Sequence, residues 1–344
     1  MGTHRSEPFR RRRPPLSGRR EAGGIAALPI LVLAAAVLST ACGAEAAEAR
    51  EWQTACDAGD VTACNDLGYR VRMGDHVLAD WRRAADLFTT ACDGGVADAC
   101  VHLARLHLHP GAGPRGVEVD SAGGAALLER GCDGGATAGC VELGDLYLVE
   151  PADSTGFRLV DTTDAASRGA TIAAGLFSRA CDGDDMLGCT RLGVLYGDGR
   201  GVEPDTERAA ALHRRSCDGG SQLGCANLGL ALETGAGVEA DPARAATLYE
   251  EACEEEMLGC LRFAEALAAG RGVTADGERA AELFIRACYG TARRDGGSPA
   301  IAEACMRVGD MYANGLGVPR ELYRAAQYFR RACALGVEAA CRRT

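Results

Sequence analysis

Cysteine is the residue type in this chain whose number and spacing most clearly permit chemistry. Sixteen of the 17 cysteines fall into eight pairs. Paired thiols can form disulfides, hold zinc or exchange electrons with a partner thiol. Six pairs are C-x7-C, namely Cys56 with Cys64, Cys92 with Cys100, Cys132 with Cys140, Cys181 with Cys189, Cys217 with Cys225 and Cys333 with Cys341. The pair Cys253 with Cys260 is one residue shorter, and the pair Cys288 with Cys305 is longer.

The C-x7-C spacing favours structural disulfides. Residues eight apart on one helix lie about 12 Å from each other, whereas a disulfide needs Cα atoms within about 4.4–6.8 Å. The chain must therefore reverse between the two cysteines, and Asp-Gly-Gly at 93–95, 133–135 and 218–220 can make that turn. Zinc sites prefer shorter gaps and four ligands. Redox-active pairs are normally exposed C-x-x-C, which leaves the two nonstandard pairs as the candidates for redox chemistry.

The elements that position these cysteines are paired helices. The first cysteines of successive pairs recur 35 to 49 residues apart, most often 36, and such a period in a helical chain predicts an α-solenoid. In the unit 187–220, Cys189, Leu192 and Tyr196 share one face of a first helix, which Gly197, Gly199 and Gly201 are expected to end. A second helix follows Pro204 and ends at Cys217.

We therefore predict an all-α fold, a right-handed α/α solenoid of about seven helix-turn-helix repeats. Each disulfide should join the end of one repeat's second helix to the start of the next repeat's first helix. The solenoid should occupy residues 54–344, after a tether and N-terminal cap at 43–53. Loop insertions are expected near 149–169 and 289–303, where the repeat spacing is stretched.

The recurring residues resemble the Sel1-like repeat family, a relative of the tetratricopeptide repeats. Its pattern is roughly A-x3-L-G-x2-Y-x2-G-x-G-V-x2-D-x2-[KR]-A-x3-[YF]-x2-A-[AC]-x2-G, and LGCTRLGVLYGDGRGVEPD, GAGV, GRGV and GLGV follow it here. The cysteine-paired form is similar to the Helicobacter cysteine-rich proteins, which carry one such disulfide per repeat. The resemblance implies the fold strongly and the function weakly, because one fold serves many functions.

Residues 1–42 read as a signal peptide. Seven arginines precede the apolar stretch 24–41, and small residues lead to Cys42. This arrangement resembles a bacterial lipobox, in which Cys42 is lipidated and begins the mature protein, although Ser39 replaces the usual leucine. Cleavage near Ala41 or Ala44 would instead leave a soluble periplasmic protein. Export by either route is consistent with an even set of 16 disulfide cysteines, because disulfides persist outside the cytosol.

Charge and composition exclude several partners and reactions. The whole chain carries −11 and residues 1–42 carry +5, so the remainder carries −16, which argues against nucleic acid as a partner. The chain contains no lysine, which removes Ser-x-x-Lys nucleophile pairs, P-loops and Schiff bases. His102, His107 and His109 cluster, but position 111 is glycine and H-E-x-x-H is absent. We predict no metal site and no cofactor.

The sequence favours a binding scaffold over an enzyme. First-helix faces of a solenoid bind extended peptides or proteins. The expected partner is therefore a protein or peptide of the cell envelope. The protein itself is expected to be anchored to the outer membrane through Cys42 or to be free in the periplasm. The alternative, implied by the Helicobacter resemblance, is a β-lactamase or penicillin-binding hydrolase, for which no catalytic residues can be assigned. The candidate binding face comprises Asn65, Asp66, Arg70, His102, Arg105, Glu142, Asp145, Arg191, Asn227, Arg262, Arg307 and Asp310.

Overall fold

The computed structural model describes residues 48–75, 77–108, 116–148, 165–289 and 299–343, and all regular secondary structure in these ranges is helical. A helix over 48–57 comes first. The remaining helices are α2 (Val61–Met73), α3 (Trp81–Asp93), α4 (Ala97–Leu108), α5 (Ser121–Asp133), α6 (Thr137–Leu148), α7 (Ala165–Asp182), α8 (Met186–Asp198), α9 (Thr206–Asp218), α10 (Gln222–Thr234), α11 (Pro242–Ala252), α12 (Met257–Ala269), α13 (Gly277–Tyr289), α14 (Pro299–Asn314), α15 (Leu322–Ala334) and α16 (Glu338–Cys341).

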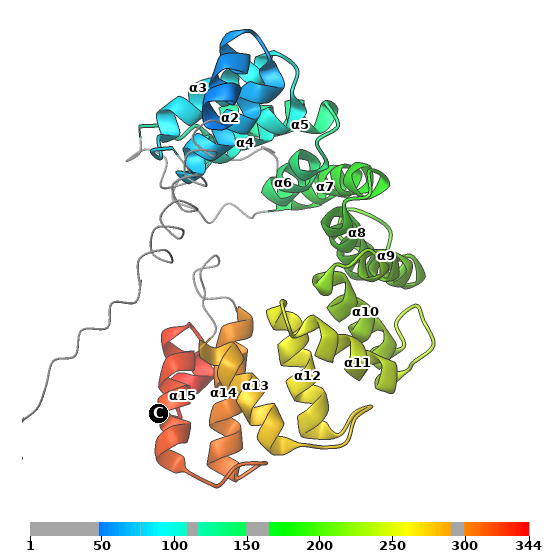
Figure 1. The fold of residues 1–344 in the computed structure, drawn as a ribbon. Coiled ribbons are helices and arrows are strands. Elements are labelled where there is room, and N and C mark those ends of the chain that lie inside the picture. Colours follow the sequence, from blue (N-terminus) through cyan, green and yellow to red (C-terminus); the bar gives the residue numbers. More distant parts are fainter. Residues whose placement is uncertain (1–47, 76, 109–115, 149–164, 290–298, 344) are drawn as a thin grey trace, which may run out of the picture.

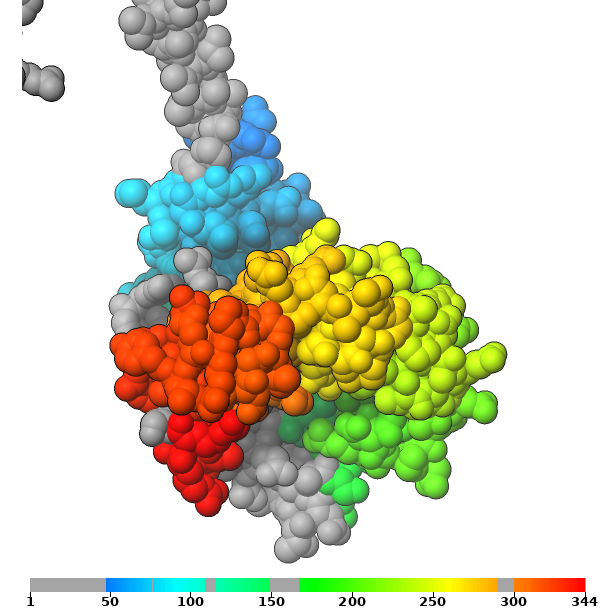
Figure 2. Space-filling view, turned by 90° about the horizontal axis from the view of Figure 1, so that it is seen from below, coloured from blue at the N-terminus to red at the C-terminus, as the bar shows by residue number. Residues whose placement is uncertain are grey.

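The helices form consecutive antiparallel pairs, from α2/α3 to α14/α15, that follow one another around an open curve (Figure 1). The space-filling view shows successive pairs as adjoining bands from green through yellow to orange and red (Figure 2). Seven complete pairs lie within the described residues. The predicted all-α solenoid of about seven helix-turn-helix repeats is confirmed. No helix in the described ranges is long and apolar enough to cross a membrane.

Local signals in the sequence set the ends of the helices, as α8 and α9 illustrate. The Asp185 carboxylate accepts hydrogen bonds from the backbone N–H groups of Leu187 and Gly188 and so begins α8. Gly199 ends the helix with φ +65°, a left-handed conformation that glycine adopts without steric cost. The expected break at Gly197 is wrong, because that residue is still helical. Asp205 caps α9 in the same way as Asp185 caps α8.

Disulfides join each helix pair to the next. In all eight, the first cysteine lies at the end of a preceding helix and the second lies in the helix that follows the turn, with Cα atoms 4.1 to 4.8 Å apart. The bonds join Cys56 to Cys64, Cys92 to Cys100, Cys132 to Cys140, Cys181 to Cys189, Cys217 to Cys225, Cys253 to Cys260, Cys288 to Cys305 and Cys333 to Cys341. The predicted arrangement is therefore the one observed, and the cysteine pairs are those that the sequence spacing predicts.

Neither of the two nonstandard pairs is exposed to solvent. Cys253 and Cys260 are buried, and so are Cys288 and Cys305, whereas Cys341 at the end of the solenoid is exposed. Redox-active cysteines need accessible sulfur. Burial therefore argues against the two nonstandard pairs as redox centres and favours a structural role for them as well.

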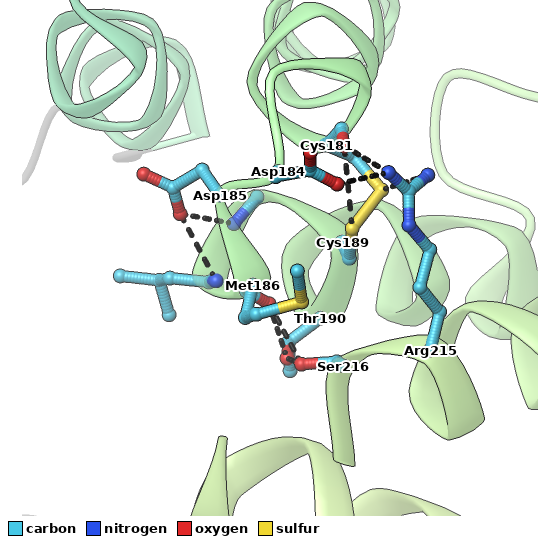
Figure 3. Close-up of a disulfide and its surroundings, with 10 residues drawn as sticks. Cys181, Asp184, Asp185, Met186, Cys189, Thr190, Arg215 and Ser216 are labelled. Carbon is cyan, nitrogen blue, oxygen red and sulfur yellow. Dashed lines mark hydrogen bonds and ion pairs between the residues drawn. A yellow bond between two sulfur atoms is a disulfide. The ribbon is translucent and has the colours of Figure 1, made fainter. Parts of the chain in front are cut away.

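In several repeats, the arginine two residues before the first cysteine of a pair contacts the disulfide of the preceding repeat. Arg215 donates to the Cys181 carbonyl oxygen at 2.8 Å and to the Asp184 carboxylate at 2.9 Å (Figure 3). The contact places a cation at the carboxyl end of a helix, where unpaired carbonyls and the helix dipole favour it. The same carbonyl contact to the preceding disulfide is made by Arg130, Arg179, Arg286 and Arg331. Sequence reasoning missed this Arg-x-Cys motif.

The core between paired helices is thin and depends on glycine. In each second helix, the residue four positions before the cysteine is buried against a first helix. A Cβ atom at Gly229 would come within 2.6 Å of the Tyr249 ring, so only glycine permits this approach. These buried residues are Phe88, Leu128, Phe177, His213, Tyr249, Phe284 and Phe329.

Four observed boundaries differ from the predicted ones. Residues 165–169 and 299–303 are helical, so both predicted insertions extend too far at their carboxyl ends. Tyr289 likewise belongs to α13. Alanine-rich sequence next to each insertion continues the helix. The expected boundary between residues 53 and 54 falls inside the helix over 48–57. The signal peptide, Cys42 and the centres of both insertions lie outside the described residues.

Candidate binding surface

The first helix of each pair lies on the inner side of the curve. Each contacts the first helix of the next pair, from α2 and α4 through to α12 and α14. In Figure 1, α6, α8 and α10 accordingly lie nearer the centre of the curve than α7, α9 and α11. The inner side of the solenoid is therefore built mainly from first helices, as the sequence predicted.

Two side chains of each first helix recur along this inner face. We number them from the second cysteine of each disulfide, as position 2 and position 5. Position 2 is occupied by Asp66, His102, Glu142, Arg191, Asn227, Arg262, Arg307 and Arg343, and position 5 by Tyr69, Arg105, Asp145, Val194, Leu230, Glu265 and Asp310. Ten of the twelve candidate binding residues occupy one of these positions; the two that do not are Asn65 and Arg70.

Position 5 of one first helix meets position 2 of the next, and we call each such contact an inner-face pair. Arg105 on α4 donates through Nε to Glu142 on α6 at 2.8 Å. Asp145 on α6 lies 3.2 Å from the Nε of Arg191 on α8. Burial raises the pKa of Asp145, and the Arg191 charge opposes that shift. Four of the predicted residues thus pair with one another across successive repeats.

The same geometry operates at the carboxyl-terminal end. Glu265 on α12 lies 3.2 Å from Arg307 on α14, and its side chain is only 11% exposed. Asp310 on α14 pairs with Arg343, which follows α16. Arg262 contacts the same Glu265 carboxylate from within its own helix, at 3.0 Å. One carboxylate therefore serves two arginines here.

His102 completes an aromatic inner-face pair near the amino-terminal end. Its ring lies 5.7 Å from Tyr69 and 5.1 Å from Phe88, centroid to centroid. Burial, with the charges of Arg105 and Arg72, lowers the pKa of His102 to about 4. The neighbouring His107 instead contacts the Glu118 carbonyl oxygen, so the two rings serve different local contacts. His109 lies outside the described residues.

The first predicted residues behave differently from the rest. Asn65 donates a long 3.4 Å hydrogen bond to the adjacent Asp66. Arg70 pairs with Asp75 in the following loop and stacks over Trp52, 5.1 Å from the ring centroid. Arg70 lies one residue beyond position 5 and faces the preceding helix. It therefore contacts a neighbouring repeat without belonging to the row of inner-face pairs, and its place on the candidate binding face stays a prediction.

Two successive steps of the inner face have no ion pair. Between α8 and α10, Val194 stands at position 5 and Asn227 at position 2. Between α10 and α12, Leu230 stands at position 5 and Arg262 at position 2. All four side chains are half-buried. Within the described ranges, no hydrogen-bond partner is found for the Asn227 amide, and the Nε of Arg262 is buried without one.

A cavity of about 640 Å³ lies between α12 and α14, beside this unpaired stretch. Three predicted residues, Arg262, Arg307 and Asp310, line it. Sequence reasoning missed the other lining side chains and the alternation of positions 2 and 5, although the spacing from the second cysteine could have revealed both. The remaining lining residues are Glu265, Ala268, Ala269, Arg271, Gly277, Phe284, Met311, Leu316 and Gly317.

Comparison with solved structures supports the same fold. A protective antigen of uropathogenic Escherichia coli displaying an SLR fold aligns over 85% of this chain, with 22% identity and a TM-score of 0.62. This chain spans 57% of that protein's length. A Sel1 repeat protein from Oxalobacter formigenes aligns over 86% of this chain and 78% of its own, with 24% identity and a TM-score of 0.60.

A third structure, Helicobacter pylori cysteine rich protein B, covers 53% of this chain and 96% of its own, at 21% identity and a TM-score of 0.20. A search of curated proteins found no match. The Sel1 repeat family model matches residues 61–96, 97–135, 187–221, 222–257, 255–290 and 302–337. The α6/α7 pair, which carries the first insertion, is not among the matched segments. The matches cover more than half of the sequence, so the chain belongs to the Sel1 repeat family.

Proposed function

We propose that this protein is an interaction scaffold that holds an extended segment of a partner protein along positions 2 and 5 of its first helices. One observation carries the proposal: position 2 presents a polar side chain on every first helix along the inner face, and position 5 does so on all of them except α8 and α10. Helical repeat proteins use such continuous surfaces to bind peptides and protein partners. Membership of the Sel1 repeat family supports the same function.

We further propose that the scaffold works in the bacterial cell envelope, anchored through a lipid on Cys42. The arginine-rich leader, the apolar stretch 24–41 and the small residues around Cys42 support export. Eight disulfides support a compartment outside the cytosol, because cytosolic thiols are kept reduced. A fatty acyl anchor at the amino terminus would hold the solenoid at the outer membrane.

Site-specific photo-crosslinking tests the binding face. Tyr69 lies at position 5 of α2 and is 42% exposed, whereas Tyr323 lies on the second helix α15 and is 73% exposed. Both side chains are exposed, so each site has room for the larger side chain of benzoylphenylalanine. We expect envelope-protein crosslinks from position 69 and few from position 323. Equal yields from the two positions would contradict a partner on the inner face.

Fractionation tests the anchor separately. Replacing Cys42 by serine should move the protein from the outer-membrane fraction to the soluble periplasm and abolish labelling by radioactive palmitate. A palmitate-free wild-type protein, or a variant that stays in the membrane, would contradict the lipid anchor without affecting the binding face.

The hydrolase alternative rests on the family resemblance alone. Ser216 lies in a disulfide-bearing junction, but it is fully buried, and its hydroxyl contacts Thr190 at 2.6 Å and the Met186 carbonyl at 2.7 Å (Figure 3). A buried hydroxyl in that environment has no access to substrate. We expect no turnover of a chromogenic cephalosporin by the oxidised protein, and clear turnover that disappears on reduction would reverse this ranking.

A further inference from the structure

The unpaired stretch of the inner face indicates what the partner segment carries. At three steps, an arginine at position 2 is met by a carboxylate at position 5 of the preceding first helix: Asp145 meets Arg191, Glu265 meets Arg307 and Asp310 meets Arg343. Arg262 also stands at position 2, but position 5 of the preceding helix is Leu230. No carboxylate of the preceding first helix therefore meets Arg262, whose carboxylate contact comes from Glu265 of its own helix.

The local charges make this gap a site for an anion. Among the described residues, Arg262 forms an ion pair only with Glu265, through Nη1, and that carboxylate is shared with Arg307. Within the described residues, the Nε of Arg262 is buried without a hydrogen-bond partner, as is the Nε of Arg191, but Arg191 has the carboxylate of Asp145 beside it. A buried guanidinium nitrogen without an acceptor is costly, and a charge-assisted hydrogen bond to a carboxylate removes that cost. Arg271 also lines the adjoining cavity, where its guanidinium is paired with Glu233.

The preceding step supplies groups that recognise a peptide rather than a small anion. The Asn227 side chain offers both an amide donor and a carbonyl acceptor, and neither has a partner within the described residues. These are the two groups needed to pair with one backbone peptide unit. Val194 and Leu230 lie half-buried beside it and offer apolar contacts. Beyond Arg262, the buried side chains of Phe284 and Met311 contribute to the lining of the cavity between α12 and α14.

We propose that α8, α10 and α12 bind an extended segment of a partner protein that carries an aspartate or glutamate flanked by aliphatic residues. Its carboxylate occupies the missing position opposite Arg262, its backbone pairs with Asn227, and its aliphatic side chains cover Val194 and Leu230. This inference rests on the proposed scaffold function and specifies the chemistry of the partner. It also explains how an acidic protein could bind an acidic segment, because the carboxylate of that segment would contact a single arginine, Arg262.

Two substitutions test the proposal without relying on loss of the fold. Arg262→Ala removes the cation. Leu230→Glu supplies the missing carboxylate from the chain itself, at a position where α12 carries Glu265, so the variant should fold and pair internally with Arg262. Leu322→Glu, at a 61% exposed site on α15, is the matched control for the added charge. Far-UV circular dichroism and a free-thiol count verify folding in each case.

The probe is a library of random dodecapeptides displayed on phage, selected on the oxidised protein and followed by titration of the synthesised winners. We expect enrichment of acidic-aliphatic sequences, and affinity reduced about tenfold or more by Arg262→Ala and by Leu230→Glu, but less than about twofold by Leu322→Glu. Binders without acidic residues, or binders indifferent to Leu230→Glu, would overturn this inference and leave the scaffold function standing. A library that yields no binder would also overturn it, while the crosslinking at position 69 judges the scaffold function independently.

Discussion

The neighbouring pairs α8/α9 and α10/α11 share one backbone plan but fill it with different chemistry. Both place the ring of the residue four positions before a cysteine over a first-helix glycine: His213 over Gly193 in one, Tyr249 over Gly229 in the other. The Tyr249 hydroxyl donates to Glu233 at 2.9 Å. The Nδ1 of His213 is buried and has no hydrogen-bond partner in the part of the chain that the structure describes. A ring that carries a polar atom stabilises this position best when that atom has a hydrogen-bond partner, as the Tyr249 hydroxyl does.

The contrast extends to the residues beside the disulfides. Directly after the second cysteine of one disulfide and directly before the first cysteine of the next, α10/α11 has the alanines Ala226 and Ala252, whereas α8/α9 has Thr190 and Ser216. Thr190, His213 and Ser216 are the buried polar side chains of the described residues, and all three belong to this pair. Along the sequence, these three polar residues lie near the boundary between two apolar core clusters, one that ends with Leu192 and Leu195 and one that begins with Leu228. The repeat plan therefore tolerates a polar core, at the expense of local stability.

Truncation of the ring in the apolar pair should have the largest effect. Tyr249→Ala leaves a cavity over Gly229 and removes one of the two partners of Glu233, so we expect a loss of about 3 to 5 kcal/mol in the free energy of unfolding. Tyr323→Ala, at a 73% exposed site, should change it by less than about 0.5 kcal/mol. Urea titration followed by circular dichroism measures both. Equal losses for the two variants would show that the ring contributes nothing at this position.

Acid should weaken the polar pair next. Burial lowers the pKa of His213 from 6.5 to about 4, so the folded ring stays neutral while the unfolded chain takes up a proton. Stability is therefore complete above pH 6.5 and falls as the pH is lowered towards 4, by about 3 kcal/mol from this residue alone. His213→Phe should remove that part of the pH dependence.

The measurement is the urea-unfolding free energy at pH 7 and pH 4.5 for both proteins. His102, whose pKa is also about 4, remains in the variant and supplies the residual acid sensitivity. The same slope in wild type and variant would rule out His213 as the acid-sensitive group.

The hydroxyl pair offers a finer test of the same region. Thr190 and Ser216 contact each other at 2.6 Å, and both also bond to the Met186 carbonyl. Removing one hydroxyl leaves the other without one of its hydrogen-bond partners. Removing both gives α8/α9 an apolar core like that of α10/α11. In a double-mutant cycle of Thr190→Val and Ser216→Ala we expect a coupling of about 1 kcal/mol. Additive losses would show that the two hydroxyls act independently.

The sequence predicted what is periodic and missed what is particular. Cysteine spacing and Asp-Gly-Gly turns gave the helix order, the disulfide positions and the inner location of the first helices, because geometry forces each of them. The pairing of Arg105 with Glu142 was not predicted, because it depends on the stagger between successive first helices. The contact of Arg215 with the carbonyl oxygen of Cys181 in the preceding disulfide was not predicted either. Both contacts cross a repeat boundary, which single-repeat periodicity cannot resolve.

The smallest expected effect compares a paired step of the inner face with an unpaired one. Asp145→Asn breaks an ion pair whose side chains are 38% and 41% exposed, so its cost should stay below about 1 kcal/mol. Leu230→Glu creates the corresponding pair with Arg262 and should raise stability by a few tenths of a kcal/mol, about as much as an exposed pair contributes. Thermal unfolding of both variants in low and high salt checks the sign, since salt should shrink both changes. A destabilising Leu230→Glu would mean that Arg262 cannot reach position 5 of α10, and the carboxylate of a bound partner segment could not meet it there either.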